Sequence, residues 1–284
     1  MKPRSFGFTH AHSVEQVFEL LGQYGDEAKI IAGGQSLVPT LNMRLSSPQL
    51  LIDISALEEL KGIRREEDKL VVGALTRHVD LQNSSLISEH LPLLATAIGH
   101  VAHAAIRNRG TIGGNLSLAD PASELPACSL ALGAELTIAN KTGHRVVHAK
   151  NYFKDLYETD LQTGDMLLSI SFPIASKNTV CGFREFVRRR GDFACTGLAL
   201  NAELVDNQFT SLSPVFFAVS NTPVLASQCA KQLLDKPLSN EIIESAVEGL
   251  DTELDIIGDL HTSAEMKLHL AKHFFKEVLS ELYD

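Results

Sequence analysis

Apolar side chains recur at helical spacing near both ends of the chain. Near the start, Ser13 and Gln16 have the spacing of a capping box, and apolar residues at positions 14, 17, 18 and 21 then fall on one helical face. Near the end, Thr262 and Glu265 repeat the capping pattern ahead of an apolar stripe that runs from 264 to 282. We therefore expect an amphipathic helix at each of these two places.

Between these helices the apolar residues come mostly in short runs that predict β-strands. Pro92 is the exception, because it opens a stretch of apolar residues at helical spacing up to Val101, and proline is well tolerated in the first turn of a helix. Lys141 to Gly143 separates two runs and predicts a hairpin turn. The predicted strands lie at residues 29–32, 50–54, 70–73, 133–140, 144–149 and 165–173.

A polar segment without periodicity, residues 174–181, predicts a domain boundary. Strands followed by helices are expected beyond it, an order typical of an α+β domain. We therefore divide the chain into residues 1–175 and a smaller C-terminal domain, residues 176–284. The strands predicted in that second domain lie at residues 182–188, 196–205 and 214–220.

The composition excludes several classes of protein. The chain has 284 residues, with 25 Lys and Arg against 35 Asp and Glu, for a formal net charge of −10. Nucleic acids and anionic membranes attract basic surfaces, so this balance argues against both as partners. No apolar run approaches the ~20 residues of a membrane-spanning helix, and the first residues lack the apolar core of a signal peptide, so we expect a cytoplasmic protein. The four cysteines lie far apart, which argues against a disulfide framework and a cysteine-ligated metal.

Two segments, AGGQS at 32–36 and TIGGN at 111–115, place a Gly-Gly pair just before a small polar residue. Glycine adopts positive φ and lets a ligand approach the backbone, where successive N–H groups bind anions. Two such turns that meet in space would hold a pyrophosphate from both sides. A single Gly-Gly pair is more often an ordinary turn, and neither segment matches the Rossmann or P-loop pattern. The residues alone leave a nucleotide site and a plain turn both open.

Longer stretches around both turns resemble the flavin subunits of molybdenum hydroxylases. AGGQSLVPTLNMRL (32–45) and IRNRGTIGGNLSLADPASELPA (106–127) are similar to the two FAD-contacting loops of that family, which includes the medium subunit of carbon monoxide dehydrogenase and the FAD domain of xanthine dehydrogenase. The similarity continues through RRGDFA (189–194) and covers nearly the whole chain. It implies a non-covalent FAD and an α+β fold, in which a p-cresol methylhydroxylase-type FAD-binding domain has two α/β subdomains, about 1–57 and 58–175.

The resemblance also implies which residues contact the cofactor. Glu124, where the family more often has Asp, would hydrogen-bond it, and Leu167 and Arg184 match further flavin-side positions. Phe193 falls where the family has a bulky residue near the isoalloxazine ring; the alternative is an ordinary core phenylalanine. The residues implied along the pyrophosphate are Ala32, Gly33, Gly34, Gln35, Ser36, Thr111, Ile112, Gly113, Gly114 and Asn115.

The resemblance further implies partner subunits. In the family a molybdopterin-binding large subunit oxidises the substrate, [2Fe-2S] clusters in a small subunit relay the electrons, and the flavin delivers them to NAD or another acceptor. This sequence has neither the cysteines nor the length for those other centres. It also departs from the family near the start of the last helix, where Met266 and Lys267 replace a Tyr-Arg pair and leave a partner or interdomain contact in question.

The other candidate sites have weaker support. His269 and His273 are four residues apart on the last predicted helix, but no third metal ligand is evident. Arg188 to Arg190 is a basic run in an acidic chain, either a solvated edge or a contact for an anionic partner or a second nucleotide. We find no nucleophile elbow, paired carboxylates or Cys–His pair in the sequence, so we expect a cofactor to supply the chemistry.

Three functions are consistent with these patterns. The first is an FAD-binding electron-transfer subunit of a molybdenum hydroxylase. The second is a self-sufficient FAD-dependent oxidoreductase on the same fold, and the third is a non-enzymatic FAD- or nucleotide-binding module. We favour the first, because residues 182–284 offer no obvious acid–base set that could act on a substrate.

Overall fold

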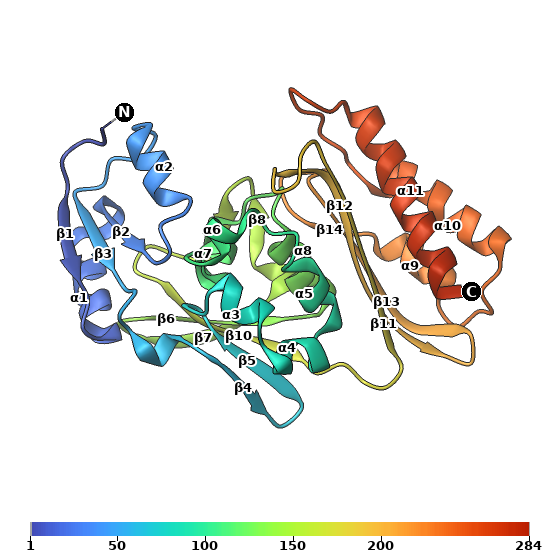
Figure 1. Cartoon of the computed structure of the whole chain (residues 1–284), viewed down its shortest axis with the longest axis horizontal. Helices are drawn as coiled ribbons and strands as arrows, with labels where there is room; N and C mark the ends of the chain where they lie inside the picture. Colours follow the sequence, from blue (N-terminus) through green and yellow to red (C-terminus); the bar gives the residue numbers. More distant parts are fainter. Residues whose placement is uncertain (1, 284) are drawn as a thin grey trace.

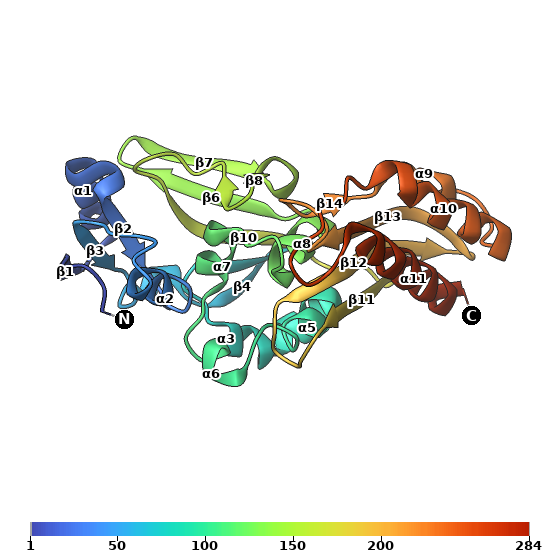
Figure 2. The ribbon, with the colours of Figure 1, turned by 90° about the horizontal axis from the view of Figure 1, so that it is seen from above.

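The structure is a computed structural model that describes residues 2–283. Its described strands form three larger sheets and one short ribbon. Figures 1 and 2 show the three sheets following one another along the long axis of the molecule, from the N-terminal sheet at one end to the C-terminal sheet at the other. The order in space therefore follows the order in the chain.

The N-terminal sheet is parallel, with strand order β1-β3-β2. A helix, α1, connects β1 to β2 and buries Val17 and Leu21. Its cap is the predicted one: Ser13 accepts a hydrogen bond from the Gln16 N–H at 3.2 Å, and the Gln16 side chain accepts one from the His12 N–H at 2.7 Å. The elements are β1 (Gly7–His10), α1 (Val14–Tyr24), β2 (Ala28–Ile31), α2 (Leu37–Asn42) and β3 (Leu50–Asp53).

The middle sheet is antiparallel, with strand order β4-β5-β10-β6-β7. Six helices follow β5 in the chain, and Figure 1 shows them gathered on one side of this sheet. The elements are β4 (Ile63–Glu66), β5 (Lys69–Gly73), α3 (His78–Gln82), α4 (Ser85–His90), α5 (Pro92–Ala97), α6 (Ala104–Arg107), α7 (Ile112–Leu118), α8 (Glu124–Ala131), β6 (Glu135–Asn140), β7 (Gly143–His148) and β10 (Met166–Pro173), with the ribbon β8 (Phe153–Asp155) and β9 (Glu158–Thr159) before β10.

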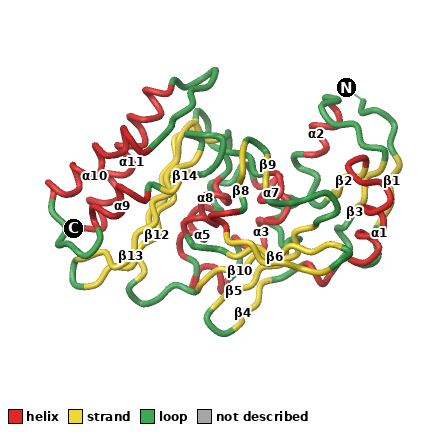
Figure 3. The backbone as a smooth tube through the Cα atoms, turned by 180° about the vertical axis from the view of Figure 1, so that it is seen from behind, coloured by secondary structure: helices red, strands yellow, loops and turns green. Residues whose placement is uncertain are grey.

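The C-terminal sheet is antiparallel, with strand order β11-β12-β13-β14. The helices of this part of the chain cover its outer face, as Figure 3 shows. The last of them is capped by Ser263, which accepts from the Met266 N–H at 3.2 Å, so the cap predicted at Thr262 is wrong by one residue. The elements are β11 (Thr179–Val187), β12 (Ala194–Val205), β13 (Gln208–Phe217), β14 (Val224–Leu225), α9 (Ser227–Leu233), α10 (Asn240–Glu253) and α11 (Ala264–Tyr283).

The middle and C-terminal sheets share one hydrophobic core. Phe183 and Phe217, from β11 and β13, stack at 5.7 Å between ring centroids and belong to the same buried cluster as Leu125 of α8. The Ala218 N–H donates to the Pro121 carbonyl at 2.8 Å, which ties the end of β13 to the segment between α7 and α8. Within residues 2–283, no helix is both long enough and apolar enough to cross a membrane.

Candidate functional site

The first glycine turn connects β2 to α2. Gly34 has φ +72°, a conformation that favours glycine over residues with a Cβ. The turn is closed by a hydrogen bond of 3.1 Å from the Gln35 side chain to the Gly33 carbonyl, and by one of 3.0 Å from the Val38 N–H to the Gly34 carbonyl. In this turn, Gly34 is therefore the glycine that the expected positive φ requires.

The second glycine turn needs glycine for a different reason. Thr111 caps α7, and its hydroxyl accepts from the Gly114 N–H at 3.1 Å. Gly113 lies inside the helix without a positive φ; a Cβ there would stand 2.5 Å from the Ala74 Cβ and 2.6 Å from the Ala74 carbonyl oxygen. The prediction of positive φ at Gly113 is therefore wrong: close packing of α7 against the chain after β5 excludes a side chain.

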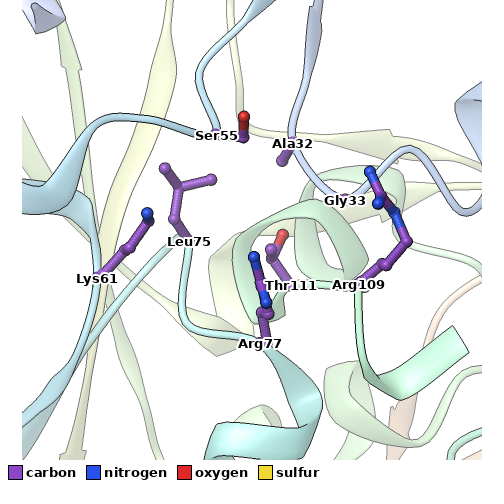
Figure 4. A pocket seen from close by; sticks show the side chains of 8 residues that line it. All are labelled: Ala32, Gly33, Ser55, Lys61, Leu75, Arg77, Arg109 and Thr111. Atoms are coloured by element: carbon purple, nitrogen blue, oxygen red, sulfur yellow. The ribbon is translucent and has the colours of Figure 1, made fainter. Parts of the chain in front are cut away.

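The two turns meet in space. A Cβ on Gly33 would lie 2.2 Å from the Arg109 carbonyl oxygen and 2.9 Å from the Gly110 Cα, so the first turn rests directly on the segment that leads into the second. Beside this contact is a small pocket of about 40 Å³, where Figure 4 shows Lys61, Arg77 and Arg109 around Ala32, Gly33 and Thr111. Lys61 is paired with Glu58 at 2.7 Å. Basic side chains at this position give the two turns a positive field that favours an anion.

Both turns line one cavity of about 1300 Å³, larger than the roughly 300–1,000 Å³ usual for drug-sized ligands. Its walls come from segments far apart in the sequence, from β2 to the loop before α11. The cavity has room for an elongated dinucleotide. The predicted site residues that line it are Ala32, Gly33, Gly34, Gln35, Ser36, Thr111, Gly113, Gly114, Asn115, Glu124, Leu167 and Phe193.

Two predicted residues do not line the cavity. Ile112 is fully buried in the core, and its N–H is already bonded to the Thr76 carbonyl at 3.0 Å. Arg184 lies on β11 with its guanidinium toward α11, where it pairs with Glu281 and, at 3.4 Å, with Glu277. In this structure Arg184 therefore helps to hold α11 on the C-terminal sheet.

Phe193 and Glu124 have very different surroundings within the cavity. Phe193 is 71% exposed, so the alternative of an ordinary core phenylalanine is wrong. Glu124 begins α8 and is only 6% exposed. Its burial raises the pKa of its carboxyl to about 7, with a further contribution from the charge of Glu185. The cavity thus contains an apolar ring open to a ligand and a carboxyl group that changes charge near neutral pH.

The sequence alone did not predict some of the residues that line the cavity. They include Val101 and Ile106, Arg188, and residues 259–261 from the loop before α11. Arg188 Nη1 lies 3.4 Å from His261 Nδ1, so part of the basic run faces the cavity mouth and not only solvent. Tertiary contacts alone bring these segments together, and their local sequence patterns carry no signal of a cavity.

The loop at 259–262 is held by the lysine that departs from the family pattern. Lys267 is 5% exposed; its ammonium donates to the Ala218 carbonyl at 2.7 Å and pairs with Asp259 at 2.8 Å. Partial burial acts to raise the pKa of Asp259, but the hydrogen bonds from Lys267 and from the loop backbone outweigh it and lower this pKa to about 2. Lys267 therefore makes a contact within the chain that positions Leu260 and His261 at the cavity.

Comparison with known proteins agrees with this geometry. Residues 4–175 match the family model described as FAD binding domain in molybdopterin dehydrogenase, and residues 182–282 match the CO dehydrogenase flavoprotein C-terminal domain. The chain is 37% identical to the 6-hydroxypseudooxynicotine dehydrogenase complex subunit alpha of Paenarthrobacter nicotinovorans, over 99% of this chain and 95% of that one.

Solved structures give the same result. Carbon monoxide dehydrogenase from Hydrogenophaga pseudoflava has a chain that superposes with a TM-score of 0.96 at 32% identity, covering 99% of this chain and 98% of that chain. Quinoline 2-oxidoreductase from Pseudomonas putida 86 superposes with a TM-score of 0.93 at 33% identity and the same coverage. The predicted α+β fold, an FAD-binding domain followed by a C-terminal domain, is confirmed. The chain belongs to the FAD-binding medium subunits of the molybdenum hydroxylases.

Proposed function

We propose that the chain holds one FAD non-covalently in its cavity and works as the electron-transfer subunit of a molybdenum-containing dehydrogenase. A small partner subunit with [2Fe-2S] clusters delivers electrons that a molybdopterin-binding large subunit takes from the substrate. NAD or another acceptor then removes them. The bound FAD supplies redox chemistry that protein side chains lack.

The observation that carries this proposal is the single cavity lined by both glycine turns and by Phe193. In the first turn the backbone N–H groups of Gly34, Gln35 and Ser36 have no hydrogen-bond acceptor among residues 2–283. In the second turn the N–H groups are used within the protein, and the hydroxyl of Thr111 keeps a proton to donate. With three basic side chains beside them, these groups suit a pyrophosphate. We assign the pyrophosphate to the turns, and other parts of the cofactor to Glu124, Leu167 and Phe193. The exposed ring of Phe193 supports a place for the flavin beside it.

We also propose that residues 1–175 form two subdomains, about 1–57 and 58–175, and that residues 176–284 form the third unit. Each of the three segments has a sheet of its own. A buried cluster around Ile52, drawn mostly from residues 11–57 and joined by Leu60, Leu75 and Met166, supports the first division. The core shared by the other two segments favours their moving as one body.

Titration of the purified chain with FAD tests the cofactor part of the proposal. One FAD per chain is expected, retained through gel filtration and released when the protein is denatured. Gly34→Val gives the matched negative, because its φ of +72° disfavours a branched residue and both Ile31 and Val38 already stand 3.3 Å from a Cβ there. A wild-type chain that stays colourless, or a Gly34→Val chain with unchanged FAD affinity, would contradict the proposal.

Co-purification of the chain from its source cells tests the second part. A complex with molybdopterin-binding and [2Fe-2S] subunits is expected, and substrate added to that complex should reduce the flavin of this chain. The same experiment separates the proposal from a self-sufficient FAD-dependent oxidoreductase, which would turn over an organic substrate without partners.

A further inference from the structure

Three ionisable side chains lie between the cavity and the surface. Glu124 lines the cavity at the start of α8. Glu185, on β11, has a side chain that is 7% exposed, and its Oε1 lies 2.9 Å from Nδ1 of His100. The His100 side chain is 43% exposed and lies against the ring of Phe183. The set therefore begins at the cofactor cavity and ends in solvent.

Glu185, the middle member of this set, has one carboxylate oxygen without a hydrogen bond. Glu185 Oε2 is buried, and no hydrogen-bond donor reaches it among residues 2–283. An unsatisfied buried polar atom costs about 1–3 kcal/mol, and more when it carries charge. A protonated Glu124, joined to it through ordered water, is a donor that would satisfy this oxygen.

The charges of the three groups act on one another. The hydrogen bond to Glu185 raises the pKa of His100, opposed by burial, and the charge of Glu124 raises it further while Arg190 lowers it. For Glu124, burial raises the pKa most, Glu185 and Asp120 raise it further, and His100 lowers it. Cys128 on α8 and Cys181 on β11 are the other titratable groups nearby, and burial raises the pKa of both thiols. Protonation of one member of the set thus changes the proton affinity of the others.

We infer that Glu124, Glu185 and His100 conduct protons between the cofactor cavity and solvent. The inference rests on the proposed function: an electron pair that enters a flavin from the [2Fe-2S] partner is accompanied by at least one proton. Glu124 gives that proton to the cavity side and is reprotonated from Glu185, His100 passes a proton to Glu185, and solvent restores His100. When an acceptor that takes only electrons oxidises the flavin, the proton leaves by the reverse route, whereas NAD takes it away with the electron pair as hydride, so no further reactant is needed.

The test measures proton uptake separately from electron arrival. The FAD-loaded chain, in weak buffer with a pH-indicator dye, is reduced by a flash-generated electron donor, and flavin bleaching and dye colour are followed together. In the wild-type chain, proton uptake should keep pace with bleaching at neutral pH. Glu185→Gln and His100→Ala should slow proton uptake by at least about tenfold, since a positioned proton donor contributes roughly 10²–10⁴-fold. Added imidazole should restore the rate in His100→Ala.

Glu277→Gln is the matched control, because Glu277 also lies beside a histidine, His273 at 3.9 Å, but on α11, where it pairs with Arg184 and does not line the cavity. It should take up protons like the wild-type chain. If Glu185→Gln and His100→Ala both bind FAD and take up protons at the wild-type rate, the relay is wrong and the proposed function stands. A wild-type chain that binds no FAD overturns the proposed function and the relay with it.

Discussion

Replacing Gly113 with alanine tests why the second turn requires glycine. The new Cβ would lie 2.5 Å from the Ala74 Cβ and 2.6 Å from the Ala74 carbonyl oxygen, closer than atoms approach without a shift. That carbonyl also accepts the Gly113 N–H at 2.8 Å, so α7 cannot move away without weakening a hydrogen bond. Overpacking of this kind costs about 1–3 kcal/mol, while the helix preference of alanine over glycine returns at most about 1 kcal/mol. We expect a net loss of about 1–2 kcal/mol.

Thermal unfolding of the FAD-free chain measures this loss. For a chain of this size the melting temperature should fall by roughly 2–8 °C. Gly22→Ala, in α1 where nothing lies within 4 Å of the new Cβ, should melt at or above the wild-type temperature. Gly114→Ala, whose Cβ meets only the Thr111 hydroxyl at 2.9 Å, should lose FAD affinity with a smaller loss of stability. A Gly113→Ala chain as stable as the wild type would refute the packing explanation.

Three further variants test other parts of the site. Phe193→Ala should change the melting temperature little, because the ring is 71% exposed. It should shift the visible spectrum or the reduction potential of bound FAD. A large loss of stability with an unchanged flavin would contradict this. Glu124→Gln should stabilise the FAD-free chain above pH 7, where the buried wild-type carboxylate is charged, by up to about 3 kcal/mol. Burial raises the pKa of Glu124 from 4.5 to about 7, so this gain in stability should disappear as the pH falls from 7 toward 4.5. Urea unfolding of both chains at several pH values measures it, and a gain that does not change with pH would contradict the reasoning. Lys267→Met should release the 259–262 loop, which would then be cleaved faster by a protease, and the chain would bind FAD more weakly. Lys267→Arg should behave like the wild type. Equal rates of proteolysis in the two variants would exclude the positioning role of Lys267.

The sequence predicted elements well where a local pattern faces one core. The first helix, its Ser13 cap and the hairpin of β6 and β7 are as expected. The helix that begins at Pro92 ends at Ala97, short of the predicted Val101, although Ile98 and Val101 beyond it stay buried. Burial after the end of a helix produces the same apolar spacing as the helix itself, so periodicity alone could not locate that end.

The site was predictable only in part. The glycine turns are visible because paired glycines followed by a small polar residue are unusual, and the structure brings the two turns together. The role of Gly113 depends on Ala74, thirty-nine positions earlier, and no local pattern indicates that contact. Arg184 was expected on the flavin side, and the structure pairs it with two acidic residues of α11. A basic residue near a flavin and one that pairs with a neighbouring helix look alike in sequence.

Reduction of the flavin by a substrate, with and without partner subunits, tests the central claim most directly. The FAD-loaded chain alone should stay oxidised in the presence of xanthine, an aldehyde or carbon monoxide under anaerobic conditions. After addition of the molybdopterin-binding and [2Fe-2S] subunits, the substrate that those subunits oxidise should bleach the flavin absorbance of this chain. Steady turnover of an organic substrate by the isolated chain would contradict the claim that it works as an electron-transfer subunit.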